Sequence, residues 1–87
     1  MAVDFLTFEL SPAGDEVEIH GDAAGLRRLA ETLRRLAGSR LSDHEHLATP
    51  EWAGDELSSE KQSLDNDTRV INQVTIRCWV PEEKAKP

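Results

Sequence analysis

Two histidines separated by a single residue, His44 and His46, are the side chains in this sequence best placed to do chemistry. In a β-strand, residues two apart point to the same side, with their backbones about 7 Å apart, so the two imidazoles form a candidate metal-ligand pair. Glu18 or His20 would supply a third ligand. No cysteine or carboxylate at a characteristic spacing accompanies the pair. Since such pairs arise often by chance, we assign no metal, and a small metal-binding protein using His44 and His46 is the less favoured alternative.

The other reactive groups do not form a catalytic set. Glu51, Asp55 and Glu56 lie in a polar segment where carboxylates are usually solvated, and nothing in the sequence pairs them. Cys78 is the only cysteine, which excludes an intrachain disulfide, and it is expected to face the core, where thiols are inert. There is no nucleophile elbow and no glycine-rich phosphate loop. The sequence therefore predicts a protein that is not an enzyme and needs no cofactor.

The chain is acidic, with a formal net charge of −7 over 87 residues. Binding to DNA or RNA needs clustered Lys and Arg, so the charge argues against nucleic acid and favours a basic protein partner. The alternative is that the charge only keeps the protein soluble. We find no signal peptide and no stretch of transmembrane length, so we expect a cytoplasmic protein without membrane contact.

One long helical pattern, at residues 22–38, organises the chain. Asp22 is expected to cap its start, and Gly38 is expected to end it in a left-handed conformation. On the polar side, Glu31 is spaced to pair with Arg27 or Arg35. The apolar side has residues at three- and four-residue steps, as an amphipathic helix requires: Leu26, Leu29, Ala30, Leu33, Leu36 and Ala37.

Four segments have the alternation of β-strands. Residues 3–10 and 16–20 flank a Pro/Gly turn and predict an antiparallel hairpin. Residues 44–49 form the third strand, and residues 69–80 form a continuous fourth strand. Residues 50–67 read as a loop, with a turn of helix expected around residues 55–60.

The order strand, strand, helix, strand, strand predicts an α+β fold. We expect a four-stranded, mainly antiparallel sheet with one α-helix packed on one face. Residues 1–80 form a single domain, followed by a charged tail at 81–87. With the leucines buried against the sheet, Leu33→Ala is expected to cost about 2–4 kcal/mol. The strand residues expected to face the helix are Leu6, Phe8, Leu10, Val17, Ile19, Leu47, Val70, Val74 and Ile76.

The opposite side of this sheet is expected to face water or a partner. Trp79 matters most there, because a tryptophan on the wrong side for the core is typical of a binding surface. The alternative is that Trp79 folds over the sheet edge or packs against the long loop. The other side chains expected on this side are Phe5, Thr7, Glu16, Glu18, His20, His44, His46, Gln73, Thr75 and Arg77.

The segment 46–58 reads HLATPEWAGDELS. It resembles a segment of the immunity protein 32 family, small antidote proteins of bacterial polymorphic toxin systems. Upstream, EIHGDAAGLRRLAETLRRL resembles the family's strand and leucine-rich helix, and downstream VINQVTIRCW resembles its closing strand. The resemblance extends over residues 16–80.

The resemblance implies a protein that binds a toxin domain and blocks it, and the acidic charge would suit a basic toxin. On this view Trp52 and Trp79 are candidate anchors, and Asp55, Glu56 and Glu60 pair with basic residues of the toxin. Trp52 is alternatively a buried anchor of its own loop. The remaining candidate contact residues, on the open side of the sheet, are Glu18, His44, His46 and Arg77.

Oligomeric state stays open at this point, between a monomer and a weak homodimer. The main alternative function is a homodimeric structural or regulatory binding module, which would use the open side of the sheet on itself.

Overall fold

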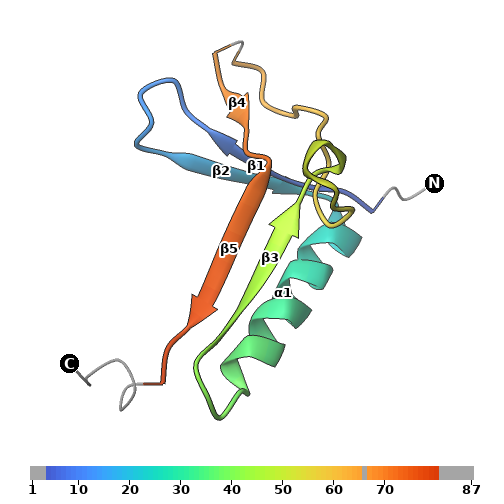
Figure 1. Ribbon diagram of the computed structural model, residues 1–87. Helices are drawn as coiled ribbons and strands as arrows, with labels where there is room; N and C mark the ends of the chain where they lie inside the picture. Colours follow the sequence, from blue (N-terminus) through green and yellow to red (C-terminus); the bar gives the residue numbers. More distant parts are fainter. Residues whose placement is uncertain (1–3, 66, 81–87) are drawn as a thin grey trace.

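The computed structural model describes residues 4–65 and 67–80, so the predicted tail at 81–87 lies outside the described residues (Figure 1). It is an α+β structure with one α-helix, as the sequence predicts. The elements in chain order are β1 (Leu6–Leu10), β2 (Val17–Gly21), α1 (Ala23–Ala37), β3 (Asp43–Ala48), the 3₁₀ helix η1 (Pro50–Trp52), β4 (Arg69–Val70) and β5 (Gln73–Cys78). The helical turn expected around residues 55–60 does not form, and η1 lies earlier in the same loop.

The expectation of a single four-stranded sheet is wrong. The strands form a three-stranded sheet in the order β2-β1-β4 and a separate two-stranded sheet, β3-β5. All pairings are antiparallel. The β1–β2 hairpin has the predicted turn, in which Gly14 takes a positive φ of 77°, a conformation that costs glycine little.

The two sheets separate because the predicted fourth strand bends at Ile71 and Asn72 and contributes to both. The Ile71 N–H donates to the Phe8 carbonyl of β1 at 2.7 Å. One residue later the Asn72 carbonyl accepts from the Thr49 N–H at 2.9 Å, and the Asn72 side-chain oxygen accepts from the Thr49 hydroxyl at 2.8 Å. The chain therefore leaves one sheet and enters the other within two residues.

The start of α1 agrees with the sequence pattern, and its end does not. The Asp22 side chain accepts from the Gly25 N–H at 2.7 Å, which confirms the predicted cap. Gly38 is right-handed, with φ −85°, because its N–H donates to the Arg34 carbonyl and simply extends the last turn. Glu31 pairs with Arg34 rather than with Arg27 or Arg35.

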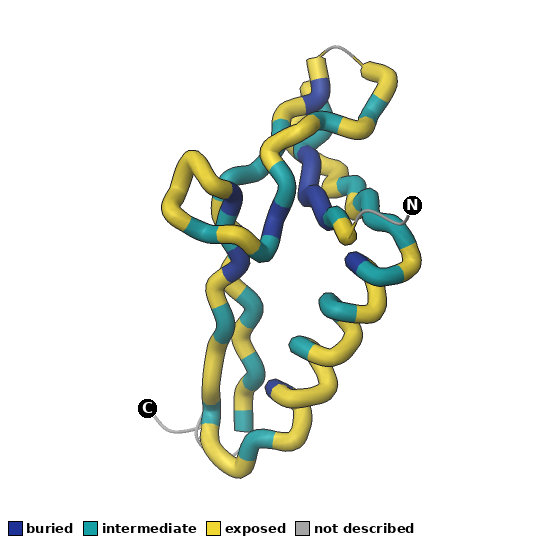
Figure 2. Tube along the Cα trace, turned by 90° about the vertical axis from the view of Figure 1, so that its right-hand side faces the viewer, coloured by how far each residue is buried: buried dark blue, intermediate teal, exposed yellow. Residues whose placement is uncertain are grey.

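The buried core lies where the two sheets meet (Figure 2). It consists of Leu6 and Phe8 from β1, Leu47 from β3 and Leu57 from the loop after η1. The opposite side of β1 is also covered, contrary to expectation. Thr7 and Glu9 have no exposed area, because the backbone of residues 62–63 lies over them and donates two hydrogen bonds to Glu9.

Four large apolar side chains expected in the core are half exposed instead: Leu26 at 46%, Leu33 at 45%, Val17 at 51% and Ile19 at 49%. For Leu26 and Leu33 the cause is the division into two sheets, because a two-stranded sheet is too narrow to cover the whole apolar side of a helix. Val17 and Ile19 lie on β2, at the edge of the three-stranded sheet. In an isolated chain, Leu33→Ala is therefore expected to lower the free energy of unfolding by about 1 kcal/mol, which is less than the loss expected for a buried leucine.

Candidate functional site

The side of the β3–β5 sheet that faces away from α1 is exposed, and we call it the outer face. It carries His44, His46, Gln73, Thr75 and Arg77, and all five are exposed. Their partners on the other side of the sheet, such as Leu47 and Val74, are buried or partly buried. The alternation predicted for these two strands is therefore confirmed.

Cross-strand register sets the neighbours on the outer face. His44 lies opposite Arg77, and His46 lies opposite Thr75. The His46 Nδ1 is 2.9 Å from the Thr75 hydroxyl and 3.1 Å from the Gln73 side-chain amide, which attaches this ring to β5. The rings of His44 and His46 meet edge to face, with centroids 4.9 Å apart.

The third metal ligand expected for this pair is not in place. Glu18 and His20 lie on β2 in the other sheet, where they are joined to each other at 2.8 Å. Within residues 4–65 and 67–80, no three His, Cys, Asp or Glu side chains gather where they could hold a metal ion. Arg77 opposite His44 adds a positive charge, which disfavours a cation beside the pair.

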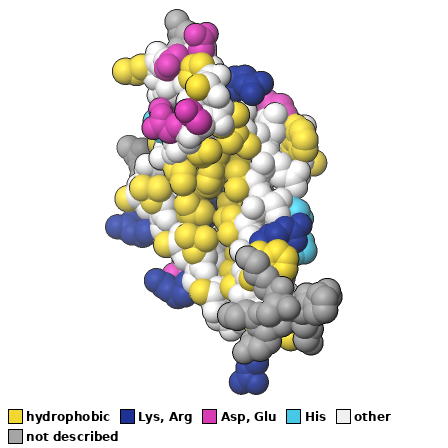
Figure 3. Space-filling model, turned by 90° about the vertical axis from the view of Figure 1, so that its left-hand side faces the viewer, with side chains coloured by type: hydrophobic (Ala, Val, Ile, Leu, Met, Phe, Trp, Pro, Cys, Tyr) yellow, Lys and Arg dark blue, Asp and Glu magenta, His cyan; other side chains and the backbone are white. Residues whose placement is uncertain are grey.

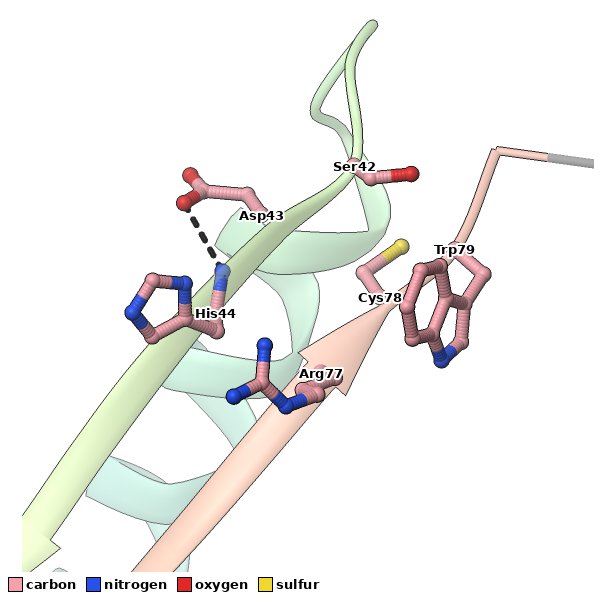
Figure 4. Close-up of a pocket in the computed structure, with 6 residues that line it drawn as sticks. All are labelled: Ser42, Asp43, His44, Arg77, Cys78 and Trp79. Carbon is pink, nitrogen blue, oxygen red and sulfur yellow. Dashed lines mark hydrogen bonds between the residues drawn. The ribbon is translucent and has the colours of Figure 1, made fainter. Parts of the chain in front are cut away.

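A shallow pocket lies at the end of the outer face (Figure 4). Its volume is about 70 Å³, whereas small-molecule sites usually enclose roughly 300–1,000 Å³. The Arg77 guanidinium extends toward His44, and the indole of Trp79 stands beside the end of β5. Trp79 is more than half exposed. The pocket is therefore much smaller than the cavities that usually hold a small molecule. The residues that line it are Ser42, Asp43, His44, Arg77, Cys78 and Trp79.

The segment 49–57, which follows β3, is held by backbone geometry. Ala53 has a positive φ of 64° at the end of η1. Gly54 lies so close to β3 that a Cβ there would be 2.5 Å from the Ala48 carbonyl oxygen. The Leu57 N–H donates to the same oxygen at 3.1 Å, and its side chain enters the core. These contacts fold the segment back against the end of β3.

Glu56 has a structural role in this segment. Its carboxylate accepts from the Ala48 N–H at 3.1 Å. This hydrogen bond is the main cause of a lowered pKa of Glu56; burial raises the pKa, but the N–H groups of Glu56 and Asp55 lower it further. Arg28 of α1 donates to the Glu56 carbonyl at 3.1 Å. The Glu56 carboxylate is thus hydrogen-bonded to the protein's own backbone.

Trp52 and Asp55 are the exposed candidates in the same segment. Trp52 is 58% exposed, so it is not the buried loop anchor that the sequence left open. The backbone hydrogen bonds that fold this segment against β3 place both residues beyond the end of that strand. This end of the β3–β5 sheet is opposite to Trp79, because Ala48 pairs with Gln73 and Asp43 pairs with Cys78.

The structure thus brings together only part of the predicted contact set. His44, His46, Arg77 and Trp79 share one surface. The other five candidates are distributed elsewhere: Trp52, Asp55 and Glu56 after β3, Glu60 in the loop that covers β1, and Glu18 on β2. Sequence reasoning missed the half-exposed residues of α1 and β2, because their periodicity is the same as that of a buried surface.

A small α+β chain with an exposed aromatic and basic surface, and with a loop that folds back against β3 and exposes a tryptophan, has the features of a protein-binding protein. Residues 16–74 match the model of the Imm32 family, immunity protein 32. The match covers about two thirds of the 87 residues, and the chain belongs to this family. No curated protein and no solved structure matches the chain. In the described part of the chain, α1 is neither long nor apolar enough to cross a membrane.

Proposed function

We propose that this protein is the immunity partner of a polymorphic toxin system, which binds its cognate toxin domain in the cytoplasm and blocks it. Membership in the immunity protein 32 family is the observation that carries this proposal. Immunity proteins generally act by binding rather than by catalysis. A toxin that is a nuclease would be basic, and a net charge of −7 complements a basic partner.

The outer face supports direct contact with the toxin. Trp79 offers a large apolar side chain next to a pocket, and an aromatic residue in this setting is a common energetic centre of an interface. Arg77 and His44 beside it supply hydrogen-bond donors. Acidic side chains on the loops, including Asp55 and Glu60, would attract the toxin over a longer range. In this proposal Glu56 shapes the loop and does not contact the toxin.

Removal of the Trp79 side chain is expected to weaken toxin binding by about 30-fold or more, the usual effect of losing an interface anchor. The measurement is calorimetric or surface-based titration of the purified toxin domain with Trp79→Ala, together with rescue of cells that express the toxin. Leu64→Ala is the matched control, because Leu64 is 100% exposed and lies in the loop before β4, a strand of the other sheet. Equal affinity for the wild type and Trp79→Ala would rule out Trp79 as an anchor.

Neutralising the exposed loop carboxylates is expected to slow association rather than speed dissociation. Asp55→Asn with Glu60→Gln should lower the association rate several-fold at low salt and have little effect at high salt, since screening removes steering. Stopped-flow kinetics at two ionic strengths measures this. An effect confined to the dissociation rate would show that the two carboxylates make close contacts instead.

A further inference from the structure

The edge of β5 that faces away from β3 is unpaired in the part of the chain that the structure describes, so it could accept a further strand. Among the described residues, β5 pairs only with β3. Thr49 and Asn72 continue the β3–β5 register, and the Thr49 N–H donates to the Asn72 carbonyl. In an antiparallel ladder, such hydrogen-bonded pairs alternate with pairs whose N–H and C=O groups point outward. The backbone groups of Gln73, Thr75 and Arg77 therefore point away from β3.

This edge lacks the devices that usually protect an edge strand. Natural edges carry charges, proline or bulges that discourage a further strand. β3 fits that description, because four of its six residues are Asp, His or Glu. β5 reads QVTIRC, with three consecutive β-branched residues, no proline and a single charge near its end. Such a strand readily accepts another strand.

An uncovered apolar surface of α1 lies beside this edge. Arg35 pairs with Glu45 of β3 at 3.2 Å, and Arg28 donates to Glu56 beyond the end of β3, so that side of the helix is held toward β3. The other side faces β5 and β2, and Figure 3 shows a continuous hydrophobic area there. We call it the apolar flank; its residues, all exposed, are Leu26, Ala30, Leu33 and Ala37.

We propose that a second copy of this chain occupies the edge, with the two β5 strands paired antiparallel about a two-fold axis at Thr75. In this register Val74 lies opposite Ile76 of the second copy, on the helix side, and Gln73 lies opposite its Arg77, on the outer face. Apolar residues thus meet apolar residues, and no like charges are opposed. The result is a four-stranded sheet, β3-β5-β5-β3, with both helices on one side.

The same two-fold axis would also bring the β1–β2 hairpin of each copy near the second copy. β5 begins beside the three-stranded sheet and ends beside the C-terminal end of α1, and the hairpin turn projects past its free edge (Figure 1). The two-fold axis therefore places the hairpin of one copy near the helix end of the other. The exposed Asp15 and Glu16 of the turn would meet the exposed Arg34 and Arg40.

The operation would pair the β5 edge, and it would turn the apolar flank and the half-exposed Val17 and Ile19 of β2 toward the second copy. A stable interface needs roughly 800 Å² and 20 residues on each copy, and an isologous contact uses the same surface twice. A strand from a toxin would cover the edge, but the self-complementary register and the opposite charges at the two ends favour a second copy. The outer face stays exposed on both copies, so this inference does not depend on the proposed function.

The first test is the mass in solution, by light scattering or sedimentation at about 10 μM, a concentration at which a dimer with a micromolar Kd is well populated. The wild type is expected at twice the 9.7 kDa of one chain. Thr75→Pro removes an outward N–H and no β3–β5 hydrogen bond, so it should run as one chain. Thr75→Val is the control: it loses the same side-chain contact with His46, keeps the N–H, and should stay dimeric. Circular dichroism checks that each variant is folded.

The second test places a charge on the apolar flank. Leu33→Glu is expected to raise the dimer dissociation constant at least tenfold, whereas Leu64→Glu, at a fully exposed leucine elsewhere, should leave it unchanged. A wild-type mass of one chain at about 100 μM would overturn the dimer. If that monomer lost toxin binding through Thr75→Pro and Leu33→Glu, the edge would belong to the toxin instead. A Trp79→Ala variant that binds the toxin as tightly as the wild type would contradict the proposed toxin contact, but it would not change the masses expected here.

Discussion

Replacing Gly25 with alanine is expected to destabilise the chain by at least about 3 kcal/mol. A Cβ at this position would lie 1.8 Å from the Phe5 carbonyl oxygen and 2.7 Å from its carbonyl carbon. Both atoms are backbone, so no side-chain rotation relieves the overlap. The Phe5 N–H donates to Asp22 at 3.3 Å, and the same Asp22 oxygen accepts from the Gly25 N–H. The alanine would therefore push the start of α1 away from the segment that leads into β1.

Helix propensity predicts the opposite sign, since alanine is favoured over glycine inside a helix by about 1 kcal/mol. Urea unfolding of Gly25→Ala therefore separates the two effects. The control is Arg27→Gly, at an exposed position of the same helix that is not part of the apolar flank, and it should cost about 1 kcal/mol through propensity alone. A Gly25→Ala variant as stable as the wild type would mean that Phe5 and α1 do not approach as closely as the structure shows.

Local signals in the sequence correctly predicted the side-chain alternation of two strands and the start of α1, but not the end of α1. Alternation predicted which residues of β3 and β5 face away from the helix, and Asp22 marked the start of α1. These features depend on neighbours along the chain, and a strand or helix period reports them directly. Gly25 is different. Glycine is needed there because the backbone of Phe5, 20 positions earlier, approaches it closely, and no local pattern reveals that contact.

The division into two sheets was not predictable from periodicity. Residues 69–80 contain no proline or glycine, so they read as one strand, and alternation does not say which strand is the partner. Asn72 on the otherwise apolar side was the available signal. Its side chain and carbonyl both contact Thr49 at the bend, and a polar residue with two such partners marks the place where the chain changes sheets.

The same local signal predicted where the candidate contact residues of β3 and β5 lie on the sheet. His44, His46 and Arg77 are on the outer face because side-chain alternation placed them there. The interpretation of Glu56 as a contact residue did not anticipate its bond to Ala48, because a carboxylate that satisfies a backbone N–H and one that attracts a toxin look alike in a polar loop. The apolar flank was misassigned to the core for a related reason. Periodicity identifies an apolar surface but does not show what that surface packs against.

Replacing Glu9 with alanine is expected to cost about 3 kcal/mol and to release the loop that covers β1. The fully buried carboxylate accepts from the Gln62 N–H at 2.9 Å, the Ser63 N–H at 3.0 Å and the Thr7 hydroxyl at 2.8 Å. Alanine would leave these donors without their acceptor beneath the loop. Native-state hydrogen exchange should show faster exchange at Gln62 and Ser63, beyond the loss of global stability that thermal unfolding measures.

The same carboxylate makes stability depend on pH. Burial raises the pKa of Glu9, but the bonds from Gln62, Thr7 and Ser63, together with the nearby His20, outweigh it and hold the pKa below its ordinary value. A group whose pKa is lowered on folding contributes stability above its unfolded pKa, about 4.3 for Glu. That contribution is lost as the pH falls through the folded pKa.

The measurable quantity is therefore the stability difference between the wild type and Glu9→Gln as a function of pH. It should be constant above about pH 5 and shrink as the pH falls further. Glu56 also has a lowered pKa, but it is present in both proteins and cancels in the difference. Glu51→Gln, at an exposed carboxylate in η1, should follow the wild type throughout. A difference that stayed constant down to pH 2 would mean that neutral glutamic acid holds the loop as well as the carboxylate does, so that the charge itself contributes nothing.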